Sequence, residues 1–89
     1  MKVTTALRET FKEVGIIVDP TARVFSDNYE YGIGVKFTHL FLNQEEKLKV
    51  ANEMGKKGFR MFFIRENMNI DRCYSGYYGG TRFYFAEQN

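Results

Sequence analysis

The feature that most constrains the fold of this 89-residue chain is a run of alternating residues from Tyr29 to Phe37. Its even positions are Glu, Gly, Gly and Lys, whereas its odd positions are all apolar or aromatic: Tyr29, Tyr31, Ile33, Val35 and Phe37. A period of two is typical of a β-strand with one buried and one solvated face. Residues 22–25 predict a partner strand, and the polar residues 26–28 predict the turn of a hairpin.

Two segments have the helical spacing needed to cover the buried face of such a sheet. The first predicts a helix with Thr4 or Thr5 as N-cap and Gly15 at its end. Its apolar stripe recurs at intervals of three and four residues and consists of Val3, Leu7, Phe11 and Val14.

The second helix is predicted from Asn43, because Asn43 and Glu46 have the spacing of a capping box. Gly58 is expected to end it, and Lys56 and Lys57 fall where cations favour the helix dipole. The residues expected on its apolar side are Leu48, Ala51, Met54 and Gly55, with Val50 beside them.

The remaining segments complete a predicted sheet. Residues 16–18 are interpreted as a short buried strand or a packed connector, 59–65 as a central strand, and 68–74 as a strand or a loop. A turn is expected over 75–80 and a closing strand over 81–87, with Phe83 and Phe85 on one face and Arg82 and Tyr84 on the other. The prediction is an α+β fold in which two amphipathic helices pack on one face of a four- to five-stranded, mainly antiparallel sheet, in the order α-β-β-β-α-β-β.

Length and composition predict one globular domain over residues 1–89. Hydrophobic residues make up 44% and charged residues 27%, which argues against long disorder. Aromatic residues reach 17%, and large rings help a small domain to build a core. A single cysteine allows no disulfide within the chain, and no apolar run has the length of a signal or a membrane span. We therefore expect a soluble cytoplasmic protein with no membrane partner.

Positive charge and aromatic residues gather in the last third of the chain. The net charge is only +2, but residues 56–82 hold six basic and two acidic residues. Residues 56–85 also carry nine of the fifteen aromatic residues. Arg and Tyr are enriched at the centres of protein interfaces, and they can also stack on bases and pair with phosphates. This segment is therefore the predicted binding surface, and Arg82 and Tyr84 are expected to be exposed if the helices cover the face of Phe83 and Phe85.

No pattern in the sequence predicts catalysis. His39 and Cys73 are the only histidine and cysteine, and neither lies in a known nucleophile signature. Two such ligands do not make a zinc site, and the glycine pairs near residues 32 and 79 open no helix that would bind phosphate. We expect a protein that is not an enzyme and has no catalytic residue, metal or cofactor.

One short segment invites comparison with the RNA-recognition motif. Lys57, Gly58 and Phe59 match the first three positions of its signature, in which strand aromatics stack on bases. Arg60 and Met61 depart from the signature, and the preceding element is a helix instead of a strand. The chain is therefore not assigned to that family.

The leading functional expectation is a small binding protein that acts by protein–protein contact on a host macromolecular complex. In size and style, though in no motif, the chain resembles small early proteins of bacteriophages, including anti-CRISPR and other inhibitors of host defence or of nucleic-acid-processing machines. The alternative is a domain that binds RNA or single-stranded nucleic acid through a basic, aromatic sheet face. A homodimer formed through an edge strand is a further possibility. The predicted binding residues are Arg60, Arg65, Arg72, Tyr74, Tyr77, Tyr78, Arg82 and Tyr84.

Overall fold

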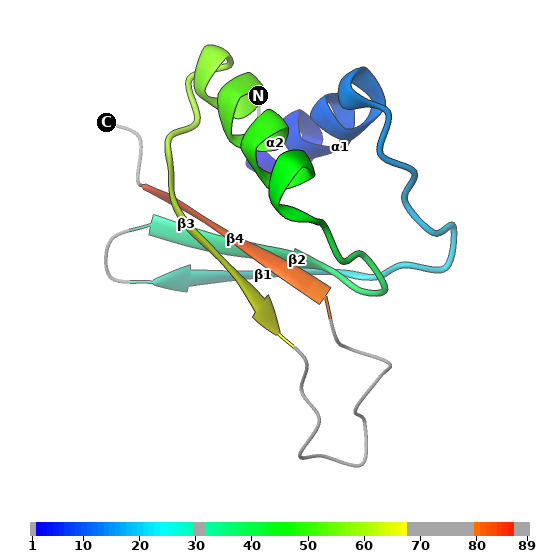
Figure 1. The fold of residues 1–89 in the computed structure, drawn as a ribbon. Coiled ribbons are helices and arrows are strands. Elements are labelled where there is room, and N and C mark those ends of the chain that lie inside the picture. The colour runs from blue at the N-terminus through cyan, green and yellow to red at the C-terminus, as the bar shows by residue number, and fades with distance from the viewer. Residues whose placement is uncertain (1, 30–31, 68–79, 87–89) are drawn as a thin grey trace.

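A computed structural model describes residues 2–29, 32–67 and 80–86, with residues 62, 63 and 65–67 described by their backbone alone. Two helices lie on the same side of an antiparallel sheet, which confirms the α+β class (Figure 1). The elements, in chain order, are α1 (Val3–Val14), β1 (Val24–Tyr29), β2 (Gly32–Phe37), α2 (Gln44–Lys56), β3 (Met61–Asn67) and β4 (Gly80–Ala86).

The four strands are arranged in the order β1-β2-β4-β3, and every neighbouring pair is antiparallel. The last strand in the sequence, β4, therefore lies inside the sheet between β2 and β3, and the prediction that residues 59–65 form a central strand is wrong because β3 is an outer strand. Two strands precede α2 where three were expected, because residues 16–18 form a connector. Ile16 is buried in this connector, whereas Ile17 is 89% exposed.

The core lies between the sheet and the two helices. Phe11 of α1 packs with its ring edge toward Phe37 of β2, with ring centroids 5.3 Å apart, and at 5.9 Å from Phe83 of β4. Thr10 of α1 donates a hydrogen bond to the sulfur of Met54 in α2 at 3.2 Å, which links the two helices. Large side chains thus fill a small core, and the residues buried there include Leu7, Phe11, Val35, Phe37, Val50, Met54, Phe83 and Phe85.

The first helix begins earlier than predicted. Its N-cap is Lys2, which has an extended backbone and makes no side-chain cap, so neither Thr4 nor Thr5 is the cap. The apolar stripe starts at Val3. Because Val3 packs against the core, a helix that includes Val3 in its first turn is favoured. Gly15 ends the helix in the left-handed conformation, with φ of 80°, as predicted.

The predicted hairpin turn is wrong. Residues 26–28 belong to β1, where Ser26 pairs with Val35 and Asn28 with Ile33. The connection to β2 falls at residues 30–31, outside the described residues. Polar composition suggested a turn, but these residues lie in an edge strand whose side chains are exposed, so polar side chains are tolerated there.

The second helix begins as predicted. The Asn43 side chain accepts a hydrogen bond from the Glu46 backbone at 2.8 Å, and the Glu46 carboxylate accepts one from the Asn43 backbone at 2.9 Å. The predicted apolar side is only partly right, because Val50 and Met54 are buried whereas Leu48 is 57% exposed. The helix contacts the core through a narrow stripe, and Leu48 lies beyond it.

We predict that Asn43→Ala lowers the free energy of unfolding by about 1 kcal/mol, because it removes the acceptor that caps α2. Urea denaturation followed by circular dichroism measures the change. Asn52→Ala is the matched control, since Asn52 is exposed within the same helix and alanine favours helix there. Equal losses of stability in the two variants would contradict a role for the cap.

Candidate interaction surface on the helix-free side of the sheet

Alternation along the strands sets which side chains lie on the side of the sheet away from the helices. On β4, Phe83 and Phe85 belong to the core, so Arg82 and Tyr84 lie on the opposite face. Residues that pair across the sheet point to the same face, so the register also identifies the residues of β1 and β2 on this side. We call the resulting set the helix-free cluster, and it consists of Phe25, Asp27, Tyr29, Gly34, Lys36, Arg82 and Tyr84.

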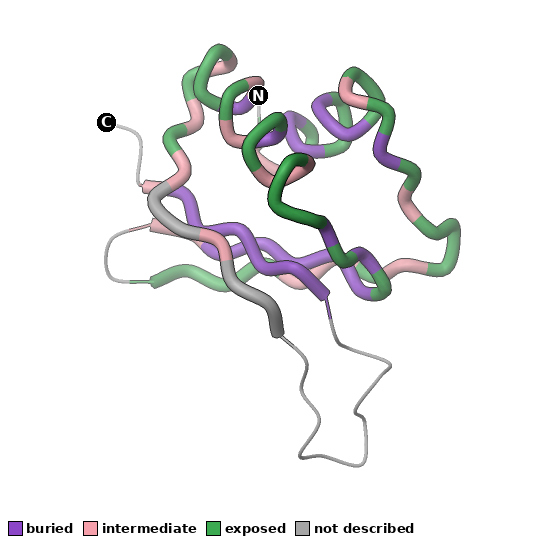
Figure 2. The backbone as a smooth tube through the Cα atoms, viewed as in Figure 1, coloured by how far each residue is buried: buried purple, intermediate pink, exposed green. Residues whose placement is uncertain are grey.

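The cluster lies on the predicted face, but the expected exposure of Arg82 and Tyr84 is wrong. Arg82 is 8% exposed and Tyr84 is 7% exposed. Both lie on β4, which is an interior strand and is coloured as buried along most of its length in Figure 2. A guanidinium in this position requires polar partners, because an unpaired buried charge is costly.

Those partners come from β1, which lies two strands away from β4. Nη1 of Arg82 donates to Oδ2 of Asp27 at 3.0 Å and to the hydroxyl oxygen of Tyr29 at 3.0 Å. Nε of Arg82 is buried and has no hydrogen-bond partner among the described residues. Asp27 and Tyr29 therefore determine where the guanidinium lies, and Arg82 in turn holds their side chains across the sheet.

Tyr29 is the exposed member of the cluster, and prediction from sequence missed it as a binding residue. It is 44% exposed, its hydroxyl accepts from Arg82, and its ring centroid lies 5.3 Å from that of Tyr84. Gly34 leaves space beneath these rings: a Cβ there would lie 2.6 Å from Cε2 of Tyr29. The sequence does contain Tyr29 in the series of apolar and aromatic residues at odd positions 29–37. That series was interpreted as the buried face of one strand, so Tyr29 was assigned to the core.

Lys36 brings a second buried cation to the same face. It is 5% exposed, and its ammonium lies 5.3 Å from the centroid of the Phe25 ring. Burial lowers the pKa of Lys36, the nearby charge of Arg82 lowers it further, and Asp27 acts in the opposite direction. Both cations on this face are thus covered by neighbouring residues of the same face.

A mainly apolar pocket of about 350 Å³ lies at one end of the sheet, where Tyr29 lines it together with residues of the helix side such as Val3, Ile33 and Phe85. Tyr29 and Asn28 come from the exposed part of β1, so the pocket adjoins the edge of the sheet. Its size and lining suit an apolar side chain of a partner. The other lining residues are Gly32, Phe59 and Ala86.

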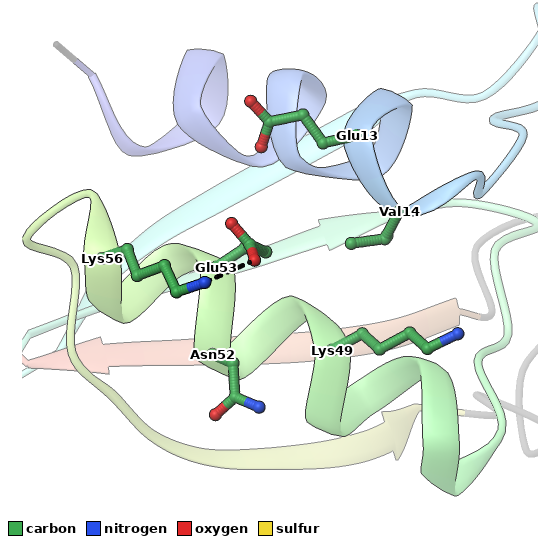
Figure 3. A pocket seen from close by; sticks show the side chains of 6 residues that line it. All are labelled: Glu13, Val14, Lys49, Asn52, Glu53 and Lys56. Carbon is green, nitrogen blue, oxygen red and sulfur yellow. Dashed lines mark hydrogen bonds and ion pairs between the residues drawn. The ribbon is translucent and has the colours of Figure 1, made fainter.

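A second pocket, of about 540 Å³, lies between the outer sides of α1 and α2 (Figure 3). Its charged side chains are paired: Lys56 lies 3.1 Å from Glu53, and Lys49 lies 3.3 Å from Glu45. Lys57 bridges to Glu13 of α1. These lysines act as structural links at the helix surface, and such exposed pairs contribute little binding energy of their own.

Of the remaining predicted binding residues, two lie within the described residues. Arg60 is exposed just before β3, and Arg65 is the cross-strand partner of Arg82 in the register of β3 and β4. Four of them lie outside the described residues: Arg72, Tyr74, Tyr77 and Tyr78. Within the described residues, the exposed part of this surface lies on β1, and a binding surface in the last third of the chain stays a prediction.

The described residues also locate His39, which is exposed in the turn after β2 with a φ of 65°, while Cys73 lies outside them. No group of three potential metal-ligating side chains occurs among the described residues. Within the same residues, neither helix has the length and apolar character needed to cross a bilayer. Comparison of the chain with protein-family models, curated proteins and solved structures found no match.

We predict that Lys36→Met stabilises the fold at neutral pH, because it keeps an aliphatic chain on Phe25 and removes a desolvated charge. The pKa of Lys36 lies below its ordinary value of 10.5, so between these two values the folded state binds fewer protons than the unfolded state. The contribution of Lys36 to stability therefore rises with pH across that interval, and the variant lacks this rise. Urea denaturation at several pH values, compared with exposed Lys12→Met, measures both effects. A destabilised variant with an unchanged pH profile would contradict the interpretation.

Proposed function

We propose that this chain is a non-enzymatic binding protein that acts by protein–protein contact, with Tyr29 and the adjoining pocket at the centre of its contact surface. We further propose that it is an inhibitor of the phage type, directed at a host defence or nucleic-acid-processing machine. The observation that carries the proposal is a half-exposed tyrosine that is held in place by a buried arginine and that also contributes to the lining of an apolar pocket at the end of the sheet.

The geometry of Tyr29 suits an energetic centre of an interface. Tyrosine combines a large apolar ring with a polar tip, and such residues dominate binding energy when they lie beside a pocket. The ring is already fixed by Tyr84 and its hydroxyl by Arg82, so little side-chain freedom is lost when a partner binds. The pocket provides a complementary cavity for an apolar side chain of the partner.

The charges of the helix-free cluster favour a protein partner over a nucleic acid. Phosphate contacts need cations that can reach the nucleic-acid backbone, and they supply most of its non-specific affinity. Lys36 and Arg82 are buried instead, with Arg82 bonded to Asp27 and Tyr29. A net charge of +2 adds little long-range attraction.

The test is partner capture from an extract of the cells in which the chain acts, followed by affinity measurement with the purified partner. We predict that Tyr29→Ala weakens binding at least about 30-fold, corresponding to about 2 kcal/mol. Gly34→Ala should also weaken it, because the added Cβ displaces the Tyr29 ring. Thr5→Ala on the exposed side of α1 is the control and should bind normally. Circular dichroism verifies that each variant is folded.

Two outcomes would overturn this assignment. Unchanged binding by a folded Tyr29→Ala variant would place the contact elsewhere. Loss of capture after nuclease treatment, together with a fall in affinity of orders of magnitude between about 50 and 200 mM salt, would favour the nucleic-acid alternative.

A further inference from the structure

The outer edge of β1 pairs with no other strand in the described sheet. β1 is an outer strand, its residues 26–29 are exposed, and its register with β2 runs without a bulge (Figure 2). It contains neither proline nor lysine, which commonly protect such edges. The opposite outer strand, β3, carries a register shift between Met61 and Phe63, which is one of the protective devices that β1 lacks.

The pairing with β2 determines which backbone groups point outward from β1. The backbone N–H of Thr38 donates to the carbonyl oxygen of Arg23 at 2.9 Å, so these residues form a hydrogen-bonded pair. Bonded and non-bonded pairs alternate along an antiparallel ladder. The backbone groups of residues 25, 27 and 29 therefore face β2, and those of Val24, Ser26 and Asn28 point away from the sheet.

We infer that two copies of this chain associate by antiparallel pairing of their β1 strands, with Ser26 of one copy opposite Ser26 of the other. Val24 then faces Asn28 of the second copy, and Asn28 faces its Val24. All three residues with outward backbone groups are used in both copies. The two sheets become one, with the helices of both copies on the same side. This inference stands on the edge of β1 and does not require the proposed function.

The second copy is favoured as the occupant because the edge is self-complementary in this register. Directly opposed residues in a ladder must point to the same face, which holds when a residue opposes its own counterpart. Centring the pair on Asp27 would still pair Ser26 with Asn28 of the other copy, but it would place two carboxylates directly opposite each other. A centre at Ser26, the middle one of the three outward-facing residues, uses all three of them in hydrogen-bonded pairs and keeps the carboxylates apart.

The charges also match in this register. Asp27 of one copy lies opposite Phe25 of the other, so the two carboxylates are offset from each other. Arg23, which is exposed and continues the register of β1, occupies the position diagonal to Asp27 of the second copy. Diagonal positions lie about 7–8 Å apart, which is within reach of a long arginine side chain. The opposite charges therefore approach each other twice, once at each end of the pair.

Sedimentation velocity of the full chain over increasing concentration tests the inference, and we expect a mass that rises toward twice that of one chain. Ser26→Pro deletes the two central hydrogen bonds between copies but no bond to β2, so it should remain a folded monomer. Ser26→Lys and Ser26→Glu should each weaken self-association about fivefold, because like charges oppose across the axis. An equimolar mixture of the two should recover association, because opposite charges then meet.

The matched controls are Thr5→Lys and Thr5→Glu on the exposed side of α1, which should associate like the wild type. The inference is overturned if the wild type stays monomeric at the highest attainable concentration. It is equally overturned if folded Ser26→Pro still dimerises, or if the Lys and Glu variants fail to recover association when mixed. Circular dichroism establishes that each variant is folded.

Discussion

The guanidinium of Arg82, buried in the interior of the sheet, constrains the whole helix-free side of this protein. Its strand, β4, contributes Phe83 and Phe85 to the core on one face and therefore presents Arg82 on the other. A buried charge must be paired, and the partners are Asp27 and Tyr29 of β1. One polar interaction thus links the outer strand to the interior strand and also orients the tyrosine that we propose as the contact centre.

Close packing around Gly34 makes this arrangement possible. The rings of Tyr29 and Tyr84 approach so closely above Gly34 that a Cβ would lie 2.6 Å from one ring and 3.1 Å from the other. The absence of a side chain at one position therefore lets aromatic rings from two different strands meet. Rings and guanidinium together form a fixed surface, while the outer edge of β1 keeps its backbone groups available for pairing.

Features that depend on local pattern were predictable from the sequence. The helix stripe through Phe11, the left-handed Gly15 and the capping box of Asn43 and Glu46 all depend on residues close in sequence. The turn at residues 26–28 was wrong, because polar composition cannot distinguish a turn from an exposed edge strand. Exposure of Arg82 and Tyr84 was also wrong, because it depends on β4 lying between β2 and β3, a long-range pairing that no local pattern encodes.

The anchoring of Tyr29 by Arg82 is tested most directly by a double-mutant cycle on the free energy of unfolding. Tyr29→Phe removes only the hydroxyl, Arg82→Met removes the guanidinium, and the double variant completes the cycle. We predict a coupling energy of about 2 kcal/mol, within the usual range for a hydrogen bond to a charged group. Strictly additive losses, with a coupling energy indistinguishable from zero, would contradict the account.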